Sequence, residues 1–173
     1  MKRRDFLSSS IAAGLGGIVA NRVAASASSA PEDKPQRGQS PVTRKILISG
    51  GNFGTAFIRY MAELIGAAKP KLLYLPTASA DNQAFVLNWY RACAGLNVEP
   101  YDQASFVESG TQKRSWDEVL LSADGIVTSG GNTLNQQAIW RAQGMDVVLK
   151  QAWNRGIVLG GASAARFAGS TKG

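Results

Sequence analysis

The stretch GIVLGGASA, residues 156–164, carries two patterns that together indicate the fold. A short apolar run that ends in glycines is typical of a strand buried on both faces of a parallel sheet. Gly161, Ala162 and Ser163 then form Gly-x-Ser, which can open a turn that presents a serine between a strand and a helix. The chain before this stretch repeats the same arrangement, in which an apolar strand runs into a small-residue turn.

Apolar runs of strand length alternate with segments of helical period along the rest of the chain. Further strands are predicted within residues 45–51, 71–79, 97–105 and 124–134. Apolar residues at helical spacing predict helices over residues 57–65, 86–93, 134–142 and 145–152. Ser115 and Glu118 have the spacing of a capping box and predict the start of one more helix. The alternation predicts an α/β domain in which a mainly parallel sheet carries helices on both faces.

The amino-terminal segment has the composition of an export signal. Residues 1–27 combine a basic start, a short apolar stretch and small residues near Ala25-Ser26-Ala27. The sequence RRDFL resembles a twin-arginine signal, and the apolar stretch is short for a bilayer span of about 20 residues. We therefore expect a signal peptide read by the twin-arginine export machinery, a periplasmic or secreted location and no stable membrane span. An uncleaved anchor is the alternative.

Composition narrows the domain plan and the classes of partner. The polar residues 28–44 are predicted to be a flexible leader, so that the α/β domain occupies residues 45–173. The formal charge is +7, but its basic residues outside the signal segment are scattered singly, so we expect no nucleic-acid partner. Cys93 is the one cysteine of the chain, which excludes an internal disulfide and a cysteine-based metal cluster. We expect Cys93 to be buried and unreactive, and we expect no cofactor.

The turns that follow the strands are the candidate functional loops, because ligands of such sheets bind beyond the carboxyl ends of the strands. The turn at residues 50–54 lacks both the dinucleotide-binding fingerprint and the Walker phosphate loop. The turn Ser129-Gly130-Gly131-Asn132-Thr133 leaves backbone N–H groups free at the start of a helix. Such a turn can hold an anion or a developing oxyanion.

Several of these segments together resemble one enzyme family. The stretch ADGIVTSGGNTLNQQAIWRAQGMDVVLKQAWNRGIVLGGASA, residues 123–164, resembles the dipeptidase E and cyanophycinase family of serine peptidases. The shared elements are the Gly-Gly-Asn-Thr turn, the Trp140-Arg141 pair, the helix that ends before Gly156, and the strand entering Gly-x-Ser-Ala. The stretch KLLYLPTASAD, residues 71–81, is also similar to the family's second strand and loop.

The resemblance implies a fold, an activity and a set of site residues. The fold would be a flavodoxin-like or class I glutamine amidotransferase-like three-layer sandwich, and the activity cleavage of peptide bonds that involve aspartate. Ser163 would be the nucleophile, and the N–H groups of Gly131 and Ala164 would form the oxyanion hole, shaped by Gly130 and Asn132. The expected partner is therefore a peptide substrate that contains aspartate.

The sequence departs from the family pattern directly after the serine. The family continues Ala-Gly-Ala, whereas this chain has Ala164-Ala165-Arg166, and the family's His and acidic partners of the serine lie further on. This chain of 173 residues contains no histidine and no acidic residue after Asp146. We expect a chain truncated at its carboxyl end relative to the family, and inactive as it stands. The alternatives are a catalytically dead module that binds aspartyl peptides or anions, and a flavodoxin-like nucleotide or flavin binder.

Overall fold

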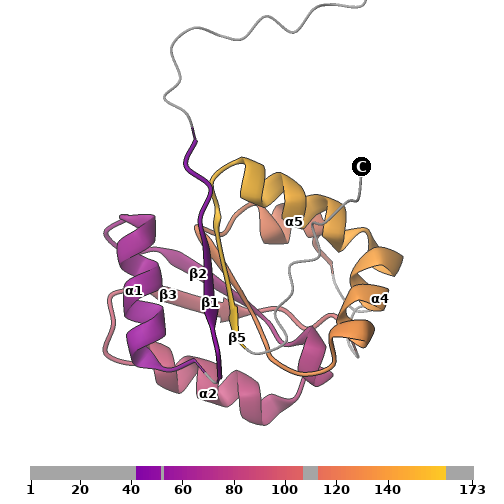
Figure 1. Cartoon of the computed structure of the whole chain (residues 1–173), viewed down its shortest axis with the longest axis horizontal. Helices are drawn as coiled ribbons and strands as arrows, with labels where there is room; N and C mark the ends of the chain where they lie inside the picture. The colour runs from indigo at the N-terminus through magenta and orange to yellow at the C-terminus, as the bar shows by residue number, and fades with distance from the viewer. Residues whose placement is uncertain (1–41, 52, 107–112, 163–173) are drawn as a thin grey trace, which may run out of the picture. The chain divides into compact units, whose positions relative to one another are not determined.

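The computed structural model describes residues 42–51, 53–106 and 113–162, all within the compact unit Gly38–Gly173. The predicted signal peptide and the predicted leader up to residue 41 lie outside the described residues. The strands are β1 (Ile46–Ser49), β2 (Lys71–Leu75), β3 (Glu99–Asp102), β4 (Gly125–Thr128) and β5 (Val158–Ala162). The helices are α1 (Thr55–Ile65), the short 3₁₀ helix η1 (Thr77–Ser79), α2 (Gln83–Cys93), α3 (Trp116–Leu120), α4 (Thr133–Gln143) and α5 (Met145–Asn154) (Figure 1).

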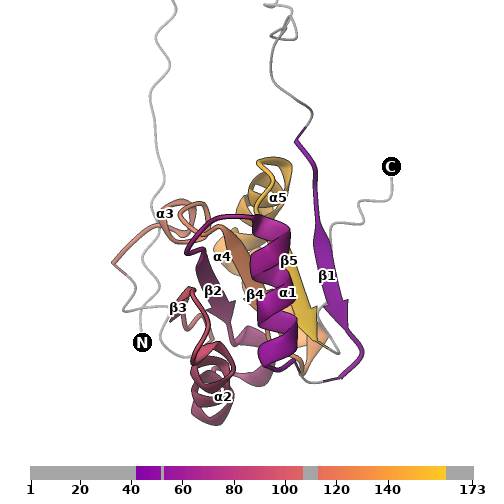
Figure 2. The ribbon, with the colours of Figure 1, turned by 90° about the vertical axis from the view of Figure 1, so that its left-hand side faces the viewer.

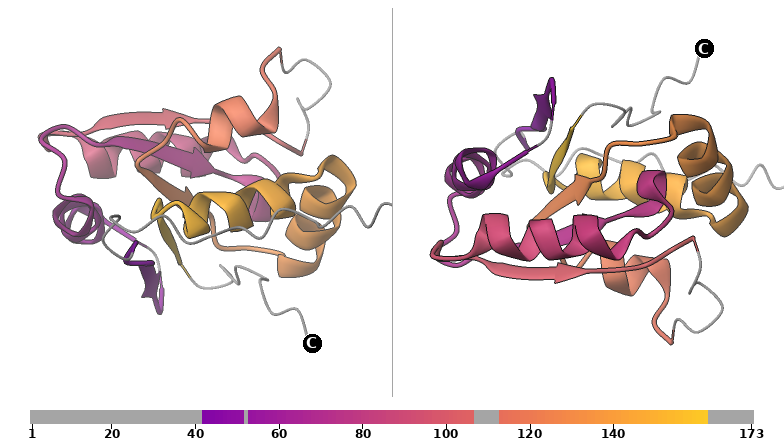
Figure 3. Two further views of the ribbon diagram at one scale, coloured as in Figure 1. Left: turned by 90° about the horizontal axis from the view of Figure 1, so that it is seen from above. Right: turned by 90° about the horizontal axis from the view of Figure 1, so that it is seen from below.

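The described strands form one five-stranded sheet in the order β1-β5-β4-β2-β3, and every neighbouring pair is parallel. The strands β1 and β3 lie at opposite margins of the sheet (Figure 3). This arrangement confirms the α/β fold with a parallel sheet that the alternating sequence pattern predicts. Pro100 lies in β3, where an edge strand tolerates a residue without an N–H group.

Helices cover both faces of the sheet, and the alternation of side chains along β2 shows how. Leu72 and Tyr74 point to the face covered by α1 and α2, whereas Leu73 and Leu75 point to the face covered by α3, α4 and α5. In Figure 2, α1 lies in front of the sheet and α4 and α5 lie behind it. Both faces of β2 are therefore buried, which explains its uninterrupted apolar run.

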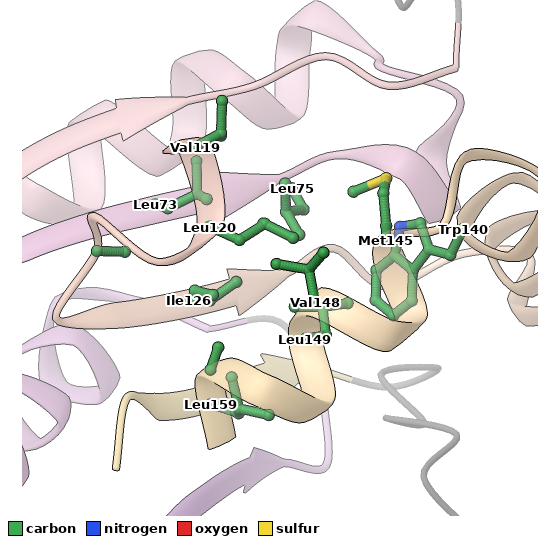
Figure 4. Close-up of a cluster of buried hydrophobic side chains, with 12 residues drawn as sticks. Leu73, Leu75, Val119, Leu120, Ile126, Trp140, Met145, Val148, Leu149 and Leu159 are labelled. Carbon is green, nitrogen blue, oxygen red and sulfur yellow. The ribbon is translucent and has the colours of Figure 1, made fainter. Parts of the chain in front are cut away.

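The second of these faces carries a continuous apolar core. Its members come from β2, β4, β5 and the three helices, and ten of them are labelled in Figure 4: Leu73, Leu75, Val119, Leu120, Ile126, Trp140, Met145, Val148, Leu149 and Leu159. Met145 and Trp140 lie next to one another at the end of this core that faces α4. The core therefore fixes α4 and α5 against the strands from which the candidate loops emerge.

Two strand glycines explain how α1 packs on the sheet. A Cβ atom on Gly125 would lie 2.7 Å from Met61 Cε, and one on Gly160 would lie 3.2 Å from Met61 Sδ. Glycine inside a strand weakens it unless another element must approach closely. The glycines of β4 and β5 therefore allow Met61, which is fully buried, to lie directly on the sheet.

The sequence predicts the helix ends correctly, but the buried face of α1 differs from the predicted one. Gly66 ends α1 in the left-handed conformation at φ 78°, and its N–H donates to the Ala62 carbonyl. The predicted capping box is present, because Ser115 Oγ accepts from the Glu118 N–H and the Glu118 carboxylate accepts from the Ser115 N–H. The spacing of apolar residues predicts an inner face of Phe57, Met61, Leu64 and Ile65, whereas the fully buried residues of α1 are Ile58 and Met61.

Within the described ranges, no helix has both the length and the apolar character needed to cross a membrane. The same residues contain no group of three or more His, Cys, Asp or Glu side chains placed to hold a metal ion. Cys93 is buried at the end of α2, as predicted, and desolvation raises the pKa of its thiol to about 12.

We expect Cys93 to resist alkylation in the folded protein. Burial hides the sulfur and its raised pKa leaves little thiolate, so iodoacetamide at pH 8 should modify it at least about a hundredfold more slowly than in the denatured chain. Mass spectrometry of the native and denatured protein, sampled over time, measures both rates. Similar rates in the two states would contradict the packing of α2 on the sheet.

Candidate active site

The candidate site lies where the order of strands reverses. From β2 the chain continues to β3, which lies toward one edge of the sheet. From β4 it continues to β5, which lies toward the opposite edge. The carboxyl ends of β2 and β4 therefore flank a topological switch point, which is where open α/β sheets bind ligands. The loops that leave these two strands are residues 76–82 and 129–132.

The two loops are in direct contact. The Ser129 N–H donates to the Leu75 carbonyl at 3.0 Å, and the Asn132 N–H donates to the Ala78 carbonyl at 2.8 Å. The Ser79 N–H donates to Ser129 Oγ at 3.3 Å. Three hydrogen bonds thus hold the glycine turn after β4, one to the end of β2 and two to η1.

Gly131 is the point of closest approach between these loops. Its φ is 142°, and a Cβ atom built on it would lie 2.1 Å from the Ala78 carbonyl oxygen. No side chain fits in that space, and L-residues rarely adopt that backbone conformation. The second glycine of the Gly-Gly-Asn-Thr turn is therefore required by the contact with Ala78.

The turn presents backbone donors at the start of α4. Asn132 is the N-cap residue, and its side chain accepts from the Asn135 N–H at 3.0 Å. In the described part of the chain, no backbone hydrogen bond uses the N–H of Gly130 or of Gly131. Free N–H groups at a helix N-terminus can stabilise negative charge on a ligand. The geometry therefore suits the predicted oxyanion hole, although the roles of these residues stay predictions.

Ser163 and Ala164 lie outside the described residues, which end with Ala162 in β5. In the sheet, Ala162 is paired with Ser49 of β1, and Gly161 is paired with Thr128 of β4. The last described residue of β5 is therefore level with the end of β4, from which the glycine turn begins. The sequence places Ser163 directly after this point.

Comparison with known proteins identifies the family. The model of peptidase family S51 matches residues 46–171. This chain belongs to that peptidase family. The match confirms the resemblance to dipeptidase E and cyanophycinase that the glycine turn and the Gly-x-Ser strand indicate.

A curated relative and two solved structures agree with this assignment. The chain is 30% identical over 124 residues to the uncharacterized peptidase YgaJ of Bacillus subtilis (strain 168), a match that covers 69% of this chain and 53% of that protein. A peptidase from an acI-B1 Actinobacterium superposes with a TM-score of 0.59 at 18% identity, covering 72% of this chain and 56% of that one. A putative peptidase E protein from Listeria monocytogenes EGD-e gives 0.55 at 17% identity, covering 70% and 60%. The chain thus spans a little over half the length of these proteins.

A polar network beneath the site connects it to the rest of this peptidase-family domain. Trp140 Nε1 donates to Thr77 Oγ1 at 3.1 Å, and Thr77 Oγ1 is also hydrogen-bonded to Ser105 Oγ. The Asp81 carboxylate accepts from the N–H groups of Ser105, at 3.0 Å, and of Phe106. Thr77, Asp81 and Ser105 are all buried, so these bonds compensate for the lost hydration of their polar groups.

The network explains one residue of the family pattern and adds others that sequence reasoning missed. Trp140, recognised only as half of the Trp-Arg pair, fixes α4 against the loop after β2. Asp81 and Ser105 were not predicted as site residues. Asp81 stands in the left-handed region at φ 55°, and its partners lie 24 and 25 residues away in the sequence. No local sequence pattern predicts a contact between residues so far apart in the chain.

A hollow of about 170 Å³ opens beside the glycine turn. It is lined by residues from five segments: Phe53, Tyr74, Phe85, Asn88, Gly130 and Ala162. Desolvation raises the pKa of Tyr74 above its ordinary range, and the nearby Ser129 hydroxyl opposes that rise. The Tyr74 phenol is therefore protonated at physiological pH and cannot serve as a general base for the serine.

We expect Gly131→Ala to destabilise the domain by about 3 kcal/mol or more. The substitution adds backbone strain at positive φ to a clash with the Ala78 carbonyl, and each cost is of the order of 1–2 kcal/mol or above. Denaturant titration followed by tryptophan fluorescence measures the free energy of unfolding.

Gly66→Ala is the matched control for this prediction. Gly66 also has a positive φ, of 78°, but the space around its missing Cβ is open. The Gly66→Ala variant should therefore lose only about 1 kcal/mol of unfolding free energy, from backbone strain alone. Equal losses in the two variants would mean that the Gly131–Ala78 contact is not as close as described.

Proposed function

We propose that this chain carries the nucleophile and oxyanion part of a serine-peptidase site. Ser163 is assigned as the nucleophile, and the N–H groups of Gly131 and Ala164 as the donors to the oxyanion, with Gly130 and Asn132 holding the turn. The observation that supports this best is the contact of Gly131 with Ala78, because it fixes an unused N–H at the end of the strand next to β5. Membership of the peptidase family supplies the reaction class.

Fixed donors of this kind act on the transition state. They stabilise the negative charge that develops on the carbonyl oxygen when a serine attacks a peptide bond. One such donor typically contributes about 3 kcal/mol to transition-state stabilisation, because it need not reorganise during the reaction. The hydrogen bonds of Asn132, Ser129 and Ser79 are what would keep the Gly131 N–H in place.

We also propose that Ser163 has no general base in this chain. A serine hydroxyl is a weak nucleophile until a neighbouring group takes its proton, and the chain of 173 residues contains no histidine. The Asp81 carboxylate already accepts two backbone N–H groups within the loop network. We propose that the chain by itself binds a peptide but does not turn it over, as a catalytically dead binding module would.

The substrate and the location are further parts of the proposal. The resemblance to dipeptidase E and cyanophycinase supports an aspartate-containing peptide as the ligand. The RRDFL start and the small residues near Ala25-Ser26-Ala27 support export and a periplasmic or secreted site of action. A flavodoxin-like nucleotide or flavin binder is the weaker alternative, because the turn after β1 lacks a phosphate-binding fingerprint.

We expect the purified 173-residue chain to hydrolyse no aspartyl dipeptide above background. Loss of the base leaves only the residual rate from the oxyanion donors and from binding. Release of aspartate from L-aspartyl-L-alanine, followed by chromatography over a day, measures the rate, and Ser163→Ala provides the baseline. A rate that is above background in the parent chain and falls in the Ser163→Ala variant would refute the proposal that Ser163 lacks a base.

We expect the same dipeptide to bind nonetheless. Isothermal titration calorimetry should detect heat with L-aspartyl-L-alanine and a weaker response with L-alanyl-L-alanine. The two peptides differ only in the aspartate carboxylate, so the pair isolates its contribution. Equal heats would overturn the aspartate part of the proposal, and absence of heat with every peptide would overturn the peptide site itself.

A further inference from the structure

The hollow beside the glycine turn is chemically unlike a pocket for an acidic side chain. Three of its residues, Phe53, Tyr74 and Phe85, are aromatic, and Asn88 supplies an amide. No Lys, Arg, Asp or Glu of the described chain lines it. A carboxylate placed there would lose hydration without gaining a cation, and that cost is large. The described lining therefore offers no ionic partner to the aspartate of a bound peptide.

The size of the hollow suits a single aromatic ring. A dry apolar cavity of about 150 Å³ is large enough to bind benzene. The hollow has a volume of about 170 Å³ and is open to solvent on one side. A phenylalanine or tyrosine side chain can therefore enter it from a bound peptide.

The walls of the hollow are held by an aromatic cluster. Phe53 lies edge-on to Tyr74, with ring centroids 5.7 Å apart, and edge-on to Trp89 at 5.9 Å. Tyr74 and Trp89 are stacked at 5.2 Å, and both are fully buried. Such a set of edge-to-face and stacked rings presents fixed faces and edges to a further ring.

Two features of the lining suggest a ligand and not only core packing. Phe85 is 40% exposed at the first turns of α2, so its ring is not required to fill the core. Asn88, one turn further along the same helix, is exposed, so its amide is open to a ligand in the hollow.

The position of the hollow relates it to the reacting bond. Gly130 precedes Gly131, whose N–H is assigned to the oxyanion, and Ala162 precedes the assigned nucleophile Ser163. A side chain seated between Gly130 and Ala162 therefore belongs to a residue next to the scissile bond. Since the described lining offers the aspartate no cation, the hollow suits the residue that follows the aspartate better than the aspartate itself.

We propose that this hollow is a specificity pocket that selects an aromatic side chain on the residue after the aspartate. The proposal rests on the peptide site proposed above and adds the chemical class of the second residue. Phe85 forms the accessible wall of the pocket, and the Asn88 amide supplies its polar contact. Peptides of the type aspartyl-phenylalanine are then the preferred ligands of this chain.

A four-peptide binding matrix tests the pocket separately from the aspartate. Calorimetry with Asp-Phe, Asp-Ala, Ala-Phe and Ala-Ala gives the contribution of each side chain independently. Burial of a phenyl ring predicts that Phe in the second position tightens binding about tenfold or more, with or without the aspartate. Phe85→Ala should remove most of this difference and leave the effect of the aspartate unchanged.

Leu87→Ala is the matched control, because Leu87 lies on the same helix, is 50% exposed and does not line the hollow. Both variants should unfold at the denaturant concentration of the parent chain, and only Phe85→Ala should alter the preference for Phe. An aspartate effect without a Phe effect would overturn the pocket and leave the proposed function standing. A Phe effect without an aspartate effect would support the pocket and refute the aspartate part of the function. Absence of binding by all four peptides would overturn both.

Discussion

The close approach of the Gly131 backbone to the Ala78 carbonyl is the constraint on which the candidate site depends. The loops after β2 and β4 can meet there only because residue 131 has no Cβ atom and accepts a φ of 142°. The hydrogen bond from the Asn132 N–H to Ala78 then fixes the residue that caps α4. One backbone contact therefore determines both the direction in which α4 leaves the sheet and the direction of the unused N–H groups at its start.

The two faces of the sheet position different halves of this site. The core beneath α3, α4 and α5 holds Trp140, whose indole N–H donates to Thr77 and so anchors the glycine turn through α4. The core beneath α1 and α2 holds Tyr74, which lines the aromatic hollow, and Trp89, which stacks on Tyr74. Alternate side chains of β2 thus serve separate purposes, because successive residues of a strand point to opposite faces. Rigidity in both cores is what keeps the turn and the hollow side by side.

Much of this architecture can be predicted from the sequence because the responsible patterns are local. The apolar runs of β2 and β4, the glycine after α1 and the Ser115–Glu118 capping box each lie within a few residues. The strand order is not local, because β1 pairs with β5 across more than a hundred residues. The same holds for the site. The glycine turn is visible as a motif, whereas the contact of Asp81 with Ser105 and the meeting of Phe53, Tyr74 and Phe85 arise only when separate elements pack together.

The chemistry of the site follows from what these elements supply and from what the chain lacks. Oxyanion donors lower the barrier only when a nucleophile attacks, and binding alone stabilises substrate and transition state alike. The 173 residues contain no histidine, so under the proposed function the turn at Gly130–Gly131 would stabilise a charge that Ser163 has no histidine to help generate. The aromatic hollow does not share this dependence, since burial of a ring needs no proton transfer. Under the proposed function, recognition of a peptide is therefore separable from its cleavage, and each can be measured without the other.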